Sequence, residues 1–208
     1  MLTPHTSTLS TIAHAFRVLT IKRAYLLCLF IVATLVPIQA QQQGSWQAFL
    51  AYYDVTRIVE GGGRVWVLAS GNVMSYDVNT GESTTYSKGN PLSDASIADI
   101  NYNATVRALL VLYSNGNIDI LHADGSVVNV PDYYNKAMTE DKTVTNIVMV
   151  GRHAYLTTMF GIIKLNMARG EIDDTYNMGT QVNDVLVEGN TIFAATVKGL
   201  YRGTLNTN

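Results

Sequence analysis

A short two-part motif occurs four times in this chain of 208 residues, and its repetition limits the possible folds more than any other feature. The clearest copy spans 154–165, where two β-rich runs flank a turn. Tyr, Thr, Ile and Phe favour a pleated, half-buried strand, and Gly161 allows a turn that is closed to bulkier residues. The other copies span 65–73, 110–118 and 192–200. The pattern predicts four β-hairpins.

The spacing of these hairpins indicates the kind of repeat. The first apolar residues after the four turns are Val73, Ile118, Ile162 and Leu200, which are separated by 45, 44 and 38 positions. A period of about 40–45 residues with four short strands per unit is typical of a β-propeller blade. Helical solenoids have similar periods, but they need amphipathic helical stripes, whereas these runs are short, β-branched and aromatic. We therefore expect an all-β chain of blades, each a four-stranded antiparallel sheet.

Each unit is expected to open with a short inner strand. These strands are placed at 58–59, 96–100, 144–147 and 182–185. A turn at 101–103 should end the second of them, because Asn favours turns. The fourth unit ends after Arg202, before an outer strand can form. Propellers typically close with about 4 to 8 blades, so we expect an incomplete ring of about three to four blades that belongs to a longer protein.

Residues 1–40 differ from the rest of the chain. They contain no acidic residue, and their basic residues are Arg17, Lys22 and Arg23. An apolar run follows at 24–36, and the small Ala40 offers a cleavage point, which is the pattern of a secretory signal peptide. The run is short for a membrane span of about 20 residues, although an uncleaved N-terminal anchor remains the alternative. We expect residues 1–40 to be a signal peptide and 41–208 to be the N-terminal part of a truncated propeller domain, without a transmembrane helix.

Cysteine usage and charge restrict the partners. The single cysteine, Cys28, lies inside the apolar run, so the mature chain has no disulfide and its core depends on burial and backbone pairing. Removal of three basic residues changes the formal net charge from −2 to −5. A mildly acidic chain has no clustered basic face for nucleic acid and should not adhere to anionic membranes.

Residues that could carry catalysis are scattered. His122 and His153 lie at hairpin positions in different units, without the spacing or the carboxylate pair of a metal site. Asp173 and Asp174 are adjacent on one strand and should point to opposite faces. Asp119 lacks the acidic ladder of a calcium loop, and Gly61–Gly63 precedes no helix that could bind phosphate. We expect no enzymatic activity, no metal and no cofactor.

The link at 131–142 is the longest polar connection and contains two adjacent tyrosines, Tyr133 and Tyr134. Amphipathic rings on a loop suit contact with a protein or a sugar. Packing between blades is the alternative role for them. We take Tyr133 and Tyr134 as the candidate partner-contact residues.

Several segments together resemble the N-terminal β-propeller of the PorZ family, a component of the bacterial type IX secretion system. They are 46–55, 91–94, 100–103, 113–119, 154–162 and 171–176. The most specific are Asn-Gly-Asn-Ile-Asp at 115–119 and Phe-Gly-Ile at 160–162. The resemblance covers the chain from about Gly44 onward.

This resemblance implies a non-enzymatic protein of the cell surface or outer membrane. Its implied partners are the other proteins of the type IX attachment complex and anionic lipopolysaccharide, to which that complex joins secreted cargo. Family members also carry a second propeller and a sorting domain, whereas this chain stops within the first propeller.

Two other readings stay open. Gly199–Tyr201 resembles the periplasmic sensor propellers of hybrid histidine kinases, which bind glycan breakdown products. A propeller hydrolase or lyase would need an acid, a base and often a metal in one place, and no such group is evident.

Overall fold

The computed structural model describes residues 53–205. The chain divides into two compact units, 1–48 and 49–208, and all described residues belong to the second. The predicted signal peptide and the resembling segment at 46–52 therefore lie outside the described residues. Within them, strands and turns account for nearly everything, which confirms the all-β prediction.

Residues 53–205 form sixteen strands in four sheets, which we number in chain order. Sheet 1 contains β1 (Val55–Gly61), β2 (Arg64–Ala69), β3 (Asn72–Asp77), β4 (Ser83–Lys88) and β5 (Pro91–Leu92). Sheet 2 contains β6 (Ile97–Asn103), β7 (Ala108–Tyr113), β8 (Ile118–His122) and β9 (Val127–Val130). Sheet 3 contains β10 (Val144–Val150), β11 (His153–Thr158), β12 (Gly161–Asn166) and β13 (Glu171–Asn177). Sheet 4 contains β14 (Val182–Glu188), β15 (Thr191–Thr196) and β16 (Gly199–Thr204).

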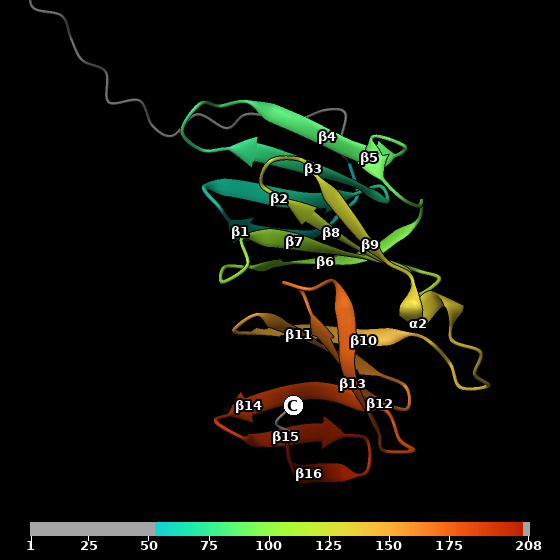
Figure 1. Cartoon of the computed structure of the whole chain (residues 1–208). Helices are drawn as coiled ribbons and strands as arrows, with labels where there is room; N and C mark the ends of the chain where they lie inside the picture. The colour runs from blue at the N-terminus through green and yellow to red at the C-terminus, as the bar shows by residue number, and fades with distance from the viewer. Residues whose placement is uncertain (1–52, 206–208) are drawn as a thin grey trace, which may run out of the picture. The chain divides into compact units, whose positions relative to one another are not determined.

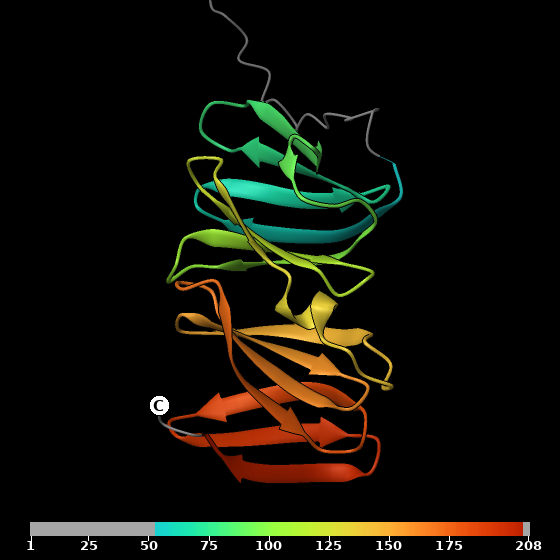
Figure 2. The ribbon, with the colours of Figure 1, turned by 45° about the vertical axis from the view of Figure 1, so that its right-hand side comes forward.

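Each sheet is an up-and-down meander in which every strand pairs antiparallel with the next, apart from the short parallel pair of β4 and β5. The sheets follow one another in chain order, with sheet 1 and sheet 4 at opposite ends of the described unit (Figures 1 and 2). The first strands of successive sheets lie next to one another, β1 by β6, β6 by β10 and β10 by β14. This is the arrangement of propeller blades around their inner strands, and here it forms an incomplete ring.

Apolar side chains fill the space between successive sheets. The central strands are buried on both faces, as in β7, where every residue from Ala108 to Tyr113 is buried. Separate apolar clusters join sheet 1 to sheet 2, sheet 2 to sheet 3, and sheet 3 to sheet 4. At about 25 cal/mol per Å² of buried apolar surface, these contacts are the main force that holds the sheets together.

The prediction of a turn at 101–103 is wrong, because β6 continues through Asn103 and the turn follows it. The Tyr102 ring stacks on Trp66 with centroids 6.5 Å apart, and it lies directly against Gly61. Burial of this ring in the interface of sheets 1 and 2 outweighs the turn preference of the asparagines that flank it.

Gly161 is required for a reason other than the predicted one. It begins β12, and its φ lies outside the left-handed region, so the expectation that it supplies a special turn conformation is wrong. A Cβ at this position would lie 2.0 Å from the carbonyl oxygen of Tyr176. Close approach of the β13 backbone therefore excludes a side chain here.

Candidate binding surfaces

The four inner strands share one local feature near their beginning. Each carries a β-bulge at the same place, and the residue after the bulge is Arg57, Asp99, Asn146 or Asp184. We call these four residues the inner-strand row. In sheets 2 to 4, the Oδ1 atom of the row residue accepts a hydrogen bond from the next backbone N–H, at 2.8 Å in each case. This bond occupies an edge donor that could otherwise pair with another chain.

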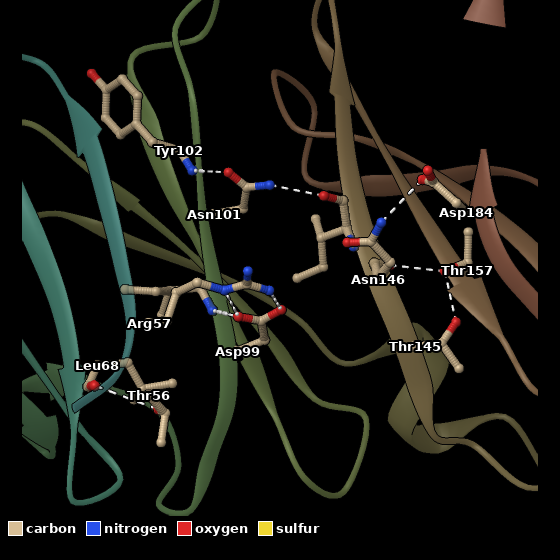
Figure 3. A network of polar contacts seen from close by, with 12 residues as sticks. Thr56, Arg57, Leu68, Asp99, Asn101, Tyr102, Thr145, Asn146, Thr157 and Asp184 are labelled. Atoms are coloured by element: carbon tan, nitrogen blue, oxygen red, sulfur yellow. Dashed lines mark hydrogen bonds and ion pairs between the residues drawn. The ribbon is translucent and has the colours of Figure 1, made fainter. Parts of the chain in front are cut away.

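The inner-strand row also connects neighbouring sheets (Figure 3). Arg57 donates to both carboxylate oxygens of Asp99, at 2.7 Å from Nε and 2.5 Å from Nη2. The hydrogen bond with Asp99 is the largest of the effects on the pKa of Arg57, and it raises that pKa. The amide of Asn146 donates to Asp184 Oδ1 at 3.0 Å, which joins sheet 3 to sheet 4. Bidentate and charge-assisted bonds of this type fix orientation more than they add stability at an exposed site.

Two further bonds cross the sheet boundaries beside the row. Asn101 Nδ2 donates to the carbonyl oxygen of Ile147 at 2.8 Å, and thus joins sheet 2 to sheet 3. The Thr145 hydroxyl donates to the carbonyl oxygen of Val182 at 2.5 Å. All three boundaries between sheets therefore carry a polar bond as well as an apolar cluster, and the sheets are held in fixed register.

The second candidate surface surrounds the link at 131–142, which contains the short helix α2 (Asp132–Asn135). Tyr133 is 1% exposed, whereas Tyr134 is 48% exposed. The Tyr133 hydroxyl donates to the carbonyl oxygen of Lys142 at 2.9 Å, and its ring packs against Phe160. Burial, and secondarily the nearby Asp141 carboxylate, raises the pKa of Tyr133. Tyr133 thus anchors the link from inside, and Tyr134 is the member of the pair that faces solvent.

A groove of about 640 Å³ runs between α2 and sheet 3. Its lining residues are Asp132, Tyr133, Asn135, Lys136, Phe160, Ile163, Glu171, Ile172 and Thr175. Phe160 and Ile163 form an apolar floor, and the charged side chains lie at the rim. A volume of this size lies within the usual range of about 300–1,000 Å³ for binding pockets.

Sequence reasoning missed a buried network around Asp119. This carboxylate is fully buried and accepts three hydrogen bonds, from the Tyr113 hydroxyl at 2.5 Å, the Ser93 N–H at 2.8 Å and Asn129 Nδ2 at 2.8 Å. Burial, followed by the bond to Asp119, raises the pKa of Tyr113. The network ties β7, β8 and β9 to the segment after β5, and the only sequence signal for it is an acidic residue within a strongly apolar strand.

His153 belongs to a charged cluster on sheet 3. His153 Nε2 lies 2.9 Å from Asp173 Oδ2, and Arg169 Nη2 lies 2.5 Å from the other oxygen of the same carboxylate. Burial alone would raise the pKa of Asp173, but hydrogen bonds from Arg169, His153 and Asn166 outweigh it and lower that pKa. Within residues 53–205, no group of three or more His, Cys, Asp and Glu side chains could hold a metal ion. The same range contains no helix that is long and apolar enough to cross a membrane.

Comparison with known families shows which β-propeller family the chain resembles. The family model described as the PorZ N-terminal β-propeller domain of the type IX secretion system matches residues 65–208. The chain belongs to this PorZ family. The family resemblance found in the sequence is therefore confirmed, and so is the incomplete propeller. No curated protein was found to match the chain.

A solved structure of PorZ from Porphyromonas gingivalis is 32% identical, with a TM-score of 0.70. The match covers 77% of this chain and 22% of that one, so the chain spans about a fifth of the solved PorZ. The Porphyromonas gingivalis protein is described as an essential bacterial surface component of the type IX secretion system.

Two more distant structures share the fold alone. The extracellular domain of the hybrid two-component system BT4673 from B. thetaiotaomicron is 16% identical, with a TM-score of 0.57 over 81% of this chain and 22% of that chain. The computationally designed Ika4 protein is 10% identical, with a TM-score of 0.55 over 79% of this chain and 95% of that chain. Because both identities are low, the resemblance to sensor propellers says nothing about signalling by this PorZ-family chain.

Proposed function

We propose that this chain is a non-enzymatic scaffold of the type IX secretion attachment complex at the outer surface of the cell, where it helps join secreted cargo to anionic lipopolysaccharide. Membership of the PorZ family is the observation that carries this proposal. The apolar clusters and the cross-sheet bonds of the inner-strand row support it, because rigidly held sheets suit a scaffold that presents loops to partners.

The test of this role uses the full-length protein that contains this chain. Deletion of its gene is expected to release cargo proteins from the cell surface into the medium, and re-expression should restore their attachment. The surface fraction and the medium are compared by immunoblotting against one cargo protein. Normal cargo attachment combined with a changed transcriptional response to glycans would instead favour the sensor role.

Binding to lipopolysaccharide is tested separately with purified material. The full-length protein is expected to co-sediment with lipopolysaccharide that carries an anionic polysaccharide, and to remain soluble with a neutral variant. Because the partner is anionic, added salt should weaken the complex. Equal binding to both forms would contradict recognition of the anionic polysaccharide.

We place a protein contact at Tyr134, on the exposed side of the α2 link beside the groove. Replacement of Tyr134 by Ser in the full-length protein should weaken co-purification of the attachment-complex partners by roughly tenfold, since exposed aromatic residues often dominate protein contacts. Tyr53→Ser, at another exposed tyrosine, serves as the matched control. Unchanged complex assembly by Tyr134→Ser would rule out this contact. Tyr133 is unsuited to the test because its removal would disturb the link itself.

A further inference from the structure

Strand β9 forms the outer edge of sheet 2, whose two faces pack on sheets 1 and 3. The His122 N–H donates to the carbonyl oxygen of Ser126 at 2.9 Å, which sets the register of β8 and β9. Bonded positions alternate in an antiparallel pair, so Val128 bonds to β8, whereas the N–H and C=O of Val127 and Asn129 point away from the sheet. Val128 is 41% exposed, and Asn129 is also exposed. This outward edge is therefore open to solvent.

Other edge strands carry a side-chain cap on an outward N–H group. In β6 and β10 the cap comes from the inner-strand row. In β13, Asp174 Oδ1 accepts a hydrogen bond from the Thr175 N–H at 2.8 Å. Within residues 53–205, no side chain caps the N–H of Val127 or Asn129 in this way. Caps oppose pairing with another chain, whereas β9, with uncharged and mostly β-branched residues, has the composition of an edge to which a strand adds.

A cavity lies beyond each end of β9. The groove between α2 and sheet 3 begins at Asp132, two residues after β9, and its floor residues Phe160 and Ile163 belong to the boundary of sheets 2 and 3. A second cavity, of about 380 Å³, borders the turn before β9 at Asp124 and Gly125. It is also lined by Arg64, Thr84, Tyr86 and Asn90, and it lies at the boundary of sheets 1 and 2.

The two cavities lie on opposite faces of sheet 2, which matches the alternation of side chains along a strand. Successive side chains of an added strand would point in turn toward sheet 3 and toward sheet 1. Phe160 and Ile163 suit an apolar side chain in the first cavity. In the second, the Arg64 guanidinium lies 3.3 Å from the Tyr86 hydroxyl and 3.8 Å from Asp77. It has more N–H donors than these two contacts use, so it suits a carboxylate.

We propose that β9 is a strand-addition site that binds an extended segment of a partner protein. The segment runs antiparallel to β9, since antiparallel pairing is the more stable. Its backbone bonds to Val127 and Asn129. It places an apolar side chain in the α2 groove and, about seven positions later, a carboxylate beside Arg64. This site is independent of the proposed secretion role.

Fluorescence polarisation with the full-length protein tests the site, and the probe is the labelled octapeptide Leu-Thr-Val-Thr-Val-Thr-Val-Glu. We expect saturable binding that weakens when lysine replaces the glutamate. Residues directly opposite in a pair share a face, and Val127 and Asn129 face sheet 1, so the threonines of the probe should bond to β9. N-methylation of the last two threonines should therefore weaken binding at least about tenfold, whereas N-methylation of the two central valines should not.

A protein variant tests the same bonds from the other side. Val127→Pro removes an outward N–H at an edge position that tolerates proline, and it should abolish binding. Val127→Thr keeps that N–H and is the matched control, and both variants are checked by circular dichroism. The N-methylated probes use the wild-type protein, so they decide the matter even where Val127→Pro does not fold.

Four results would overturn the proposal. They are the absence of saturable binding, equal effects of the two N-methylation patterns, full binding by a folded Val127→Pro variant, and a dimer of the wild-type protein that Val127→Pro dissociates. The last result would assign the β9 edge to a second copy of the chain instead of a partner segment.

Discussion

Asp119 joins several parts of sheet 2 through one carboxylate. Its two oxygens accept bonds from Tyr113, Ser93 and Asn129, residues that come from different segments of the chain. It belongs to the Asn-Gly-Asn-Ile-Asp stretch that carried much of the family resemblance. In the same stretch, Gly116 has a φ of 84° and lies against the Tyr133 ring, which leaves little room for a side chain. This motif therefore has a structural role in connecting sheet 2 to the α2 link.

Replacement of Asp119 by Ala should destabilise the domain by about 2–4 kcal/mol, because the buried Tyr113 hydroxyl and the donors of Ser93 and Asn129 all lose their acceptor. Urea unfolding followed by circular dichroism measures this change as a lower midpoint. Asp124→Ala is the control, since this exposed turn carboxylate bonds only to nearby Ser126. A loss of stability no larger than that of the control would show that the network contributes little.

At the scale of elements, the packing of neighbouring strands decides at which glycines a substitution costs the most stability. Gly161 is buried, and a Cβ there would meet the Tyr176 carbonyl oxygen of β13. Gly151, in the turn between β10 and β11, has a φ of 55° and open space around its Cα. Gly161 is required because the neighbouring backbone leaves no room for a side chain. Gly151 is required because its positive φ strains any other residue.

Gly161→Ala should therefore cost more stability than Gly151→Ala. The first change places a methyl group against the Tyr176 carbonyl, and we expect about 3 kcal/mol, in the range of an overpacked core site. The second costs about 1 kcal/mol, through backbone strain alone. Thermal unfolding of both variants checks the order. Equal losses would mean that β13 moves aside to accept the methyl group.

At the scale of the whole domain, hydrogen-bonded aspartates link stability to pH. The pKa values of five aspartates lie below the ordinary value of 3.8: Asp77, Asp94, Asp124, Asp141 and Asp173. For Asp77 the largest cause is the backbone N–H of Asn79, and for Asp141 it is the side-chain hydrogen bond with Thr143. Each folded pKa lies below the unfolded one, so the ionised form stabilises the fold above the unfolded value.

We expect the urea midpoint to be constant from neutral pH down to about pH 5 and to fall as the pH drops through about 4 and below, where these carboxylates take up protons. Asp173→Asn should show a smaller fall than the wild type, because one of the five groups no longer titrates. Identical acid profiles for the variant and the wild type would remove Asp173 from this linkage.

Much of the fold could be predicted from the sequence because its signals are local. Short β-branched and aromatic runs between turn-forming Gly, Asn and Asp located the four inner strands, although each strand continues beyond its predicted end. The candidate site was less predictable. Tyr133 and Tyr134 are the same residue type, but one is buried and the other is exposed, and no local sequence pattern distinguishes them. The helix α2 is too short to produce a helical periodicity in the sequence.

The sequence by itself determined the repeat, the all-β class and the family, since each depends on the order of residues within one blade. The tertiary structure alone decided that Asn101 continues a strand, that Asp119 is buried, and that Arg57 meets Asp99. These outcomes depend on partners 26 to 46 residues away, brought close only when one sheet packs on the next. Burial against such neighbours outweighs local preference, because it removes far more apolar surface from water than a turn can stabilise.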